Sequence, residues 1–363
     1  MKRAFHSSII AILCATLGIA ASGIERDRPT KWSDCLRQSP EFYATTEAVR
    51  IADNALLYQR QSGGWPKNTD LAVRLSEREK TEIIRAKSST DSTIDNGATF
   101  TELAYLARVY AAKKLDRHKT GFLRGVDYLL RAQYTNGGWP QYYPQLTGYY
   151  KHITFNDDAM IGVMKLLRDI AAKKSDYAFI DEDRRKRVER AVEKGIACIL
   201  KTQILVRGKL TVWCAQHDEV TLAPASARAY EPASLSGAES VEVVRFLMSI
   251  PHPSEEIISA IEAAVAWFEK SKITGIRWVE KSDGSNSNQV DHAIARDTEA
   301  EPIWARFYEI GTDRPIFLGR DGVKKYDVAE IEAERRNNYR WYSNAPAELL
   351  EKDYPVWRKK RRS

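Results

Sequence analysis

Apolar residues recur at the spacing of an amphipathic helix in three long stretches of the chain. Within residues 92–114 the apolar positions include Phe100, Leu103, Leu106 and Tyr110. A period of three to four residues is typical of a helix with one buried face. The same period is present in 152–174 and 227–250, and further helical stretches lie at 122–133, 184–203 and 255–270. Strand-like alternation is scarce and short, so the pattern predicts a mainly α-helical protein.

A tryptophan precedes each of the three long stretches, and the tryptophans are 74 residues apart. They are Trp65 in QSGGWPKN, Trp139 in TNGGWPQYYP and Trp213 in GKLTVWCAQHD. Equal spacing of a motif and the helix that follows it indicates a structural repeat. We therefore predict three helical hairpins that can close into a ring, with their loops at one end. Each tryptophan either packs two helices together or lines a cleft, and the cleft alternative is strongest for Trp139.

Polar residues occupy the loop before the long helix of each repeat. The first loop contains Asp95 and Asn96, the second Asp157 and Asp158, and the third Arg228. Asp and Asn before a helix are common N-caps, which is the simplest explanation for any one of them. Taken together, two acidic loops on one face of a repeat would form an oxygen-rich site. Calcium accepts such irregular sets of carboxylate and amide oxygens, although neither loop has the spacing of an EF-hand.

Several arginines lie close together near the carboxyl end, in a segment that also contains Trp304, Phe307 and Tyr308. They include Arg306, Arg314 and Arg320. Arginines beside aromatic residues are suited to binding carboxylates through two hydrogen bonds.

The first residues of the 363-residue chain have the pattern of a secretory signal peptide. Lys2 and Arg3 precede an apolar run at 9–20 that is too short to span a membrane, and small residues follow at 20–23. Removal of residues 1–23 takes two charges from the 56 Lys and Arg and leaves 54 − 49 = +5, against +7 for the whole chain. We predict an exported protein, secreted or periplasmic, with no membrane association after the signal is removed.

The remaining chain divides into one large domain at 24–345 and a basic tail at 346–363, and we expect its last residues, WRKKRRS at 357–363, to be mobile. A basic exported protein without a nucleic-acid motif is better suited to an acidic polymer outside the cell than to nucleic acid. Cys35, Cys198 and Cys214 remain after export. Two alternatives remain for these cysteines: one disulfide bridge, such as Cys198 with Cys214, or three buried free thiols.

Six blocks of sequence, in order from about residue 56 to about residue 342, resemble the family 10 polysaccharide lyases, which are pectate lyases. They are GGWPKN, STIDNGAT, NGGWPQYYP, HITFNDDAM, TVWCAQHDEVTLAPASARAYEPASLSGAES and PIWARFYEIGTDRPIFLGRDGVKKYD. The resemblance implies an (α/α) toroid with a smaller irregular lobe and a cleft between them. It also implies calcium-dependent β-elimination of polygalacturonate, with Ca²⁺ as the cofactor and the acidic polysaccharide as the partner of a monomer.

The resemblance also implies roles for individual residues. The acidic pair corresponds to Asp95 and Asp157, and the catalytic base corresponds to Arg228. Asn96, Asn156 and Asp158 are further candidates for the cation. Burial near calcium and other arginines is expected to lower the pKa of Arg228. The substrate-binding candidates are Asp95, Trp139, Lys151, Tyr230, Arg306, Arg314 and Arg320.

Two other classes of function remain open. A glycoside hydrolase would use Asp95 with Asp157 or Glu231 as its acid and base, without a metal. A pectin-binding protein without catalysis would not need to keep Asp95, Asp157 and Arg228 together.

Overall fold

The computed structural model describes residues 31–281 and 291–362. The predicted signal peptide at 1–23 lies outside the described residues. The prediction of a mainly α-helical protein is confirmed, and the strands are short. No helix within these two ranges has both the length and the apolar character needed to cross a membrane.

The longer helices begin where the sequence supplies a capping side chain. Thr45 caps α2, Asp181 caps α7 and Ser254 caps α9, each accepting a hydrogen bond from a backbone N–H of the first turn. The helices are α1 Trp32–Cys35, α2 Thr46–Tyr58, α3 Glu77–Arg85, α4 Phe100–Lys113, α5 Asp116–Ala132, α6 Ala159–Ala171, α7 Glu182–Thr202, α8 Glu239–Met248, α9 Glu255–Lys270, α10 Ala333–Asn337, α11 Ala345–Glu348 and α12 Tyr354–Arg362.

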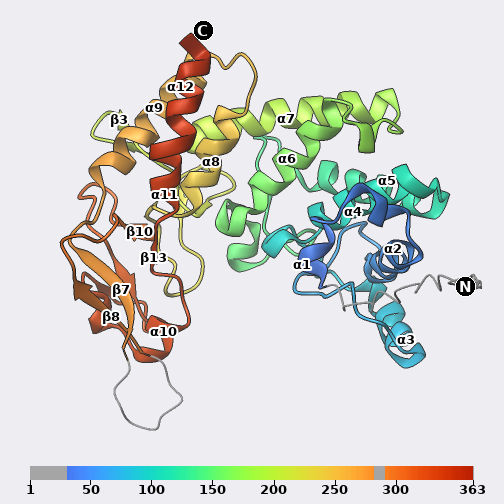
Figure 1. Ribbon diagram of the computed structural model, residues 1–363, viewed down its shortest axis with the longest axis horizontal. Helices are drawn as coiled ribbons and strands as arrows, with labels where there is room; N and C mark the ends of the chain where they lie inside the picture. Colours follow the sequence, from blue (N-terminus) through green and yellow to red (C-terminus); the bar gives the residue numbers. More distant parts are fainter. Residues whose placement is uncertain (1–30, 282–290, 363) are drawn as a thin grey trace, which may run out of the picture.

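Three helical hairpins form the larger part of the molecule. Helix α4 packs against α5, α6 against α7, and α8 against α9, while α4, α6 and α8 contact one another in chain order (Figure 1). The three hairpins of the sequence analysis are therefore present, and the closed ring remains a prediction.

A buried tryptophan joins each of these units to a preceding helix. The indole Nε1–H of Trp65 donates to Ala55 O at 2.7 Å, that of Trp139 to Leu129 O at 2.8 Å and that of Trp213 to Ile199 O at 2.7 Å. Trp304, which the 74-residue spacing does not reveal, donates in the same way to Phe268 O at 2.9 Å. All four side chains are 0% exposed. The structure thus does not place Trp139 in a cleft wall, because its ring is enclosed by the core and its one polar atom bonds to a helix carbonyl.

Short antiparallel pairings connect the loops that follow the tryptophans. A three-stranded sheet contains β1, β4 and β5, and isolated bridges join Trp65 to Thr93, Thr93 to Tyr142, and Pro140 to Ile153. The strands are β1 Ile153–Thr154, β2 Leu205–Val206, β3 Lys209–Leu210, β4 Gln216–His217, β5 Pro224–Ala225, β6 Leu235–Ser236, β7 Ile276–Lys281, β8 Asp291–Arg296, β9 Trp304–Ala305, β10 Phe307–Tyr308, β11 Phe317–Leu318, β12 Lys324–Lys325 and β13 Tyr342–Ser343.

The segment after α9 forms a smaller and less regular part. The β7–β8 hairpin packs against α10 and projects away from the helical hairpins (Figure 1). The basic tail is helical in the described residues: α11, a π-helical turn at Leu349–Asp353 and α12 follow in succession, and Leu349 is fully buried. The mobility of 357–363 stays a prediction. The three cysteines within the described ranges, Cys35, Cys198 and Cys214, are buried free thiols, which leaves the suggested Cys198–Cys214 bridge unformed.

Candidate functional site

Two short turns before α4 and α6 carry the acidic residues. They are the 3₁₀ turns Asp95–Gly97 and Asn156–Asp158, and they lie in contact with each other. Asn96 and Asp157 both have φ of 50°, a left-handed conformation that Asn and Asp tolerate better than most residues. The N-cap residues of α4 and α6 are Thr99 and Asp158, and neither makes a side-chain capping hydrogen bond. The N-cap explanation therefore does not account for Asp95 or Asp157.

A cavity of about 100 Å³ brings together the main predicted residues. Asp95, Asn96, Asp157 and Arg228 all line it. Asn156, a further candidate for the cation, and Glu231, the alternative carboxylate of a hydrolase, also line it. The other lining residues are Lys67, Gln141, Tyr149 and Gln216, which were not among the predicted site residues. The sequence held one signal for three of them, because Lys67, Gln141 and Gln216 each follow a repeat tryptophan by two or three residues.

Each cation that lines this cavity is paired with a carboxylate. Lys67 forms an ion pair with the buried Asp95. Arg228 binds Glu231 through two nitrogens, with Nε 2.8 Å from Oε2 and Nη2 bonded to Oε1. Burial on its own would raise the pKa of Glu231, but hydrogen bonds and charge from Arg228 hold it below its usual range. A carboxylate held in this way is poorly suited to be the general acid of a hydrolase.

The environment of Arg228 differs from the expectation. Its hydrogen bonds to Glu231 raise the pKa of the guanidinium above its usual value, whereas a lowered value was expected. The physical reason is that the nearest charge is a buried carboxylate, only 4% exposed, rather than another arginine. The ring of Tyr230 lies 4.9 Å from the guanidinium carbon and also supports the cation.

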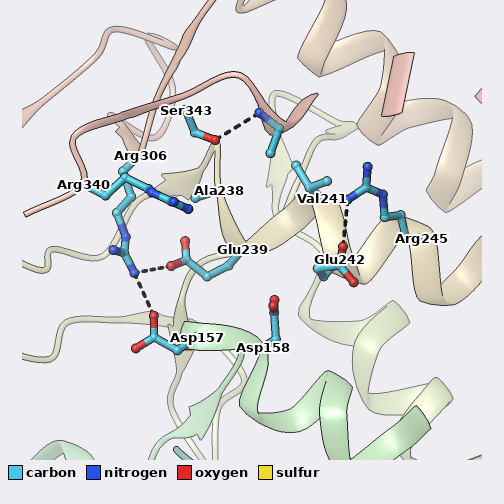
Figure 2. Close-up of a pocket in the computed structure, with 11 residues that line it drawn as sticks. Asp157, Asp158, Ala238, Glu239, Val241, Glu242, Arg245, Arg306, Arg340 and Ser343 are labelled. Atoms are coloured by element: carbon cyan, nitrogen blue, oxygen red, sulfur yellow. Dashed lines mark hydrogen bonds and ion pairs between the residues drawn. The ribbon is translucent and has the colours of Figure 1, made fainter. Parts of the chain in front are cut away.

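A second pocket of about 250 Å³ shares Asp157 with the first (Figure 2). Arg306 points between Asp157 and Glu239, and its Nη2 lies 3.7 Å from Asp157 Oδ1, 3.0 Å from Asn156 Oδ1 and in contact with Glu239 Oε1. Burial raises the pKa of Asp157, although the charge of Arg306 opposes this. Arg306 thus lines the second pocket with Glu239 as its buried partner, and its role in substrate binding stays a prediction.

Asp158 lines only the second pocket, together with Glu242. Burial and then the charge of Glu242 raise the pKa of Asp158 to about 6. It therefore does not line the cavity that contains Asp95 and Asn96.

The remaining predicted residues line neither pocket. Lys151 Nζ pairs with Glu219 Oε1 at 2.9 Å. Glu219 in turn lies close enough to His152 and Asp218 for the three side chains to hold a metal ion together. Arg314 stacks on Tyr326, and Arg320 pairs with Glu334. Tyr230 is 6% exposed and is packed among arginines.

The first cavity has the chemistry of a calcium site. Asp95 Oδ1 is buried and has no hydrogen-bond partner among the residues that the structure describes. A second carboxylate and an amide side chain, from Asp157 and Asn96, line the same small volume. Hard oxygen donors of this kind fit calcium.

Comparison with known proteins gives the family. The family model for pectic acid lyase matches residues 59–350. A solved structure of the family 10 polysaccharide lyase from Cellvibrio cellulosa has 34% sequence identity and a TM-score of 0.74, over 90% of this chain and 94% of that chain. A mutant of that lyase in complex with trigalacturonic acid has 34% identity and a TM-score of 0.77, over 90% of this chain and 95% of the other. None of the curated proteins compared with the chain matches it. The match along most of the sequence and the shared fold show that this chain belongs to the pectic acid lyase family, the family 10 polysaccharide lyases.

Proposed function

We propose that this protein is a calcium-dependent pectate lyase that cleaves de-esterified polygalacturonate by β-elimination. The observation that carries the proposal is that Asp95, Asp157 and Arg228, from three separate repeats, line one cavity. The complex of its structural relative with trigalacturonic acid supports a galacturonan as the substrate. We also infer that residues 1–23 direct export and that the exported protein acts as a monomer.

The reaction removes the C5 proton of a galacturonate and expels the oxygen at C4. The residues suited to hold the cation are Asp95 and Asp157, with Asn96 beside them. Calcium bound there would neutralise the C6 carboxylate and stabilise the negative charge that develops on it. Arg306 lies beside Asp157 and supplies a fixed positive charge at the same edge of the site.

Arg228 is the proposed base. Glu231 binds Nε and Nη2 on one edge of the guanidinium group and so fixes its orientation. Nη1 is then the nitrogen left to receive the C5 proton. Because only the unprotonated form can accept a proton, the rate depends on a small fraction of Arg228.

Ultraviolet absorbance of polygalacturonate tests the proposed reaction, since elimination leaves a C4–C5 double bond. Absorbance should rise with the protein and calcium, and the rise should stop when calcium is chelated. New reducing ends without new absorbance would instead indicate a hydrolase, and the absence of new ends would indicate a binding protein.

The calcium ligands are tested separately by Asp157→Asn. This change removes a charged oxygen donor, so the calcium concentration for half-maximal activity should rise about tenfold or more. Asp53→Asn, on α2 where Asp53 pairs with Arg117 of α5 and lies outside both pockets, is the control and should leave the calcium titration as it is. An unchanged titration for Asp157→Asn would place the cation on other residues.

A further inference from the structure

The residues that follow the four buried tryptophans form a set. Lys67, Gln141 and Arg306 lie two residues after Trp65, Trp139 and Trp304, and Gln216 lies three residues after Trp213. The indole hydrogen bonds fix the four tryptophans, so these side chains start from four rigid points. Three of the four line the small cavity, and the fourth, Arg306, contacts Asp157 at its edge.

The two charged members and the two glutamines differ in their partners. Lys67 is paired with Asp95, and Arg306 with Glu239. Gln141 and Gln216 are only 5% and 2% exposed, yet Gln141 Oε1 and Gln216 Nε2 have no hydrogen-bond partner within the described part of the chain. A buried polar atom without a partner costs stability, so its presence on a cavity wall points to a ligand.

The backbones of both glutamines are held firmly. The carbonyl of Gln141 accepts hydrogen bonds from Ile94 N at 3.2 Å and from Thr93 Oγ1 at 2.5 Å, immediately before Asp95. Gln216 pairs with Thr154 on one side and Ala225 on the other, in the sheet between the loops of Asp157 and Arg228. The main chain thus holds both glutamines in place on the wall of the cavity that contains Asp95, Asp157 and Arg228.

Gln59, another buried glutamine, has a structural role and can be compared with Gln141 and Gln216. Gln59 follows α2, is 2% exposed, and donates from Nε2 to Gly63 O and Gly121 O, both at 2.8 Å. It connects the end of α2 to α5. Gln141 and Gln216 make no such side-chain bridge among the described residues.

We propose that Gln141 and Gln216 bind the galacturonate unit in the catalytic cavity, with Gln141 Oε1 accepting from a sugar hydroxyl and Gln216 Nε2 donating to a hydroxyl or carboxylate oxygen. This inference rests on the proposed function and extends it to two residues. The cations that line the cavity are each paired with a carboxylate, and the unpartnered Asp95 Oδ1 is assigned to calcium. The two neutral amides then supply buried hydrogen-bonding capacity for the sugar. They would select a polyhydroxylated ligand, whereas arginine selects negative charge.

Gln141→Leu and Gln216→Leu, made one at a time, test the inference. Each change removes one hydrogen bond to substrate, so kcat/KM on polygalacturonate should fall about fivefold to tenfold. Each also removes an unpartnered buried polar atom, so Tm should stay the same or rise. Gln59→Leu is the matched control, and it should lower Tm because it breaks two hydrogen bonds while kcat/KM of the folded protein stays unchanged.

A binding measurement separates this inference from the proposed function. Calorimetry with trigalacturonic acid and calcium, in an Arg228→Ala background, should show affinity about fivefold to tenfold weaker for each glutamine variant. Unchanged affinity and unchanged kcat/KM would overturn the inference and leave the lyase assignment standing. If the unaltered protein does not cleave polygalacturonate, the proposed function fails, and the binding of trigalacturonic acid still decides the role of the glutamines.

Discussion

At the scale of single residues, the acidic pair and the arginine were predictable and their partners were not. Asp95, Asp157 and Arg228 stand in sequence blocks that resemble a known family, and the structure places them around one cavity. Lys67 and Glu231 stand in the same blocks, but their pairing with Asp95 and Arg228 was not predicted, because an ion pair depends on folding that brings the two charges together. For the same reason the raised pKa of Arg228 could not be foreseen.

Arg228→Ala removes the proposed base. We expect turnover of polygalacturonate to fall at least a hundredfold, which is the usual contribution of a general base, while binding of the polymer is retained. Arg117→Ala is a close control, since Arg117 also binds a carboxylate, Asp53, through two nitrogens and has a similarly exposed side chain. A variant at Arg228 that keeps more than a few per cent of the rate would place the base elsewhere.

The pH dependence of the reaction follows from the same residue. Glu231 raises the pKa of Arg228, so the unprotonated fraction stays small and grows about tenfold for each unit of pH. The rate kcat/KM should therefore keep rising with pH into the alkaline range, up to the pH at which the protein unfolds. A plateau reached below pH 8 would contradict arginine as the base and indicate a group with a lower pKa.

At the scale of helices, the spacing of apolar residues predicted where the helices lie, but it did not predict the residue at which each helix begins. The stretch at 92–114 was predicted to hold one helix, and α4 spans Phe100–Lys113. The residues before Phe100 form the left-handed turn at Asn96 instead of a longer helix. The 74-residue spacing found three of the four tryptophans, but Trp304 follows a longer connection from α9 and so falls outside the spacing.

A buried carboxyl group in helix α4 should make the stability of the protein depend on pH. Glu102 in its first turn is 3% exposed, and burial raises the pKa of its carboxyl from 4.5 to about 7. Because the folded-state pKa is raised, the folded protein holds this proton more tightly than the unfolded chain. The stabilisation is complete below pH 4.5 and is lost as pH rises through 7, by about 3 kcal/mol in the free energy of unfolding.

Glu102→Gln removes this titration. Denaturant unfolding at pH 5 and pH 8 should show a difference between the two pH values that is about 3 kcal/mol smaller for the variant than for the unaltered protein. Glu193→Gln, on the exposed face of α7, should leave that difference unchanged. If Glu102→Gln also leaves it unchanged, the carboxyl is not protonated in the folded protein at neutral pH.

At the scale of the whole molecule, the composition indicated a globular protein suited to an acidic polymer. It did not indicate that the C-terminal segment packs against the helices. The run WRKKRRS at 357–363 suggested a mobile tail, yet the preceding residues are anchored. Arg245 of α8 binds Glu348 at 3.0 Å and Asp353 at 2.7 Å, and Leu349 and Leu350 are buried. Charge dominates the composition of this segment, whereas two leucines and one arginine on another helix fix its position.

Two truncations test this role. A chain that ends at Asn344 exposes the sites of Leu349 and Leu350, and its free energy of unfolding should fall by about 3–6 kcal/mol. A chain that ends at Arg358 loses residues 359–363, of which 359–361 are exposed, and should stay within about 0.5 kcal/mol of the full chain. Equal stability of the two truncated chains would mean that the tail does not anchor α8.

The cavity around Asp95 is lined by residues from several repeats, so no single helical hairpin can form it alone. The cavity can therefore form only when these repeats have docked. Its lining runs from Lys67 to Glu231, and Arg306 completes its edge from beyond α9. A chain whose helices have formed but whose units have not docked possesses every one of these residues and no binding site. Contacts so distant in sequence form slowly. Recovery of ligand binding after denaturation therefore reports the last event of folding, and substrate present during refolding stabilises only the completed molecule.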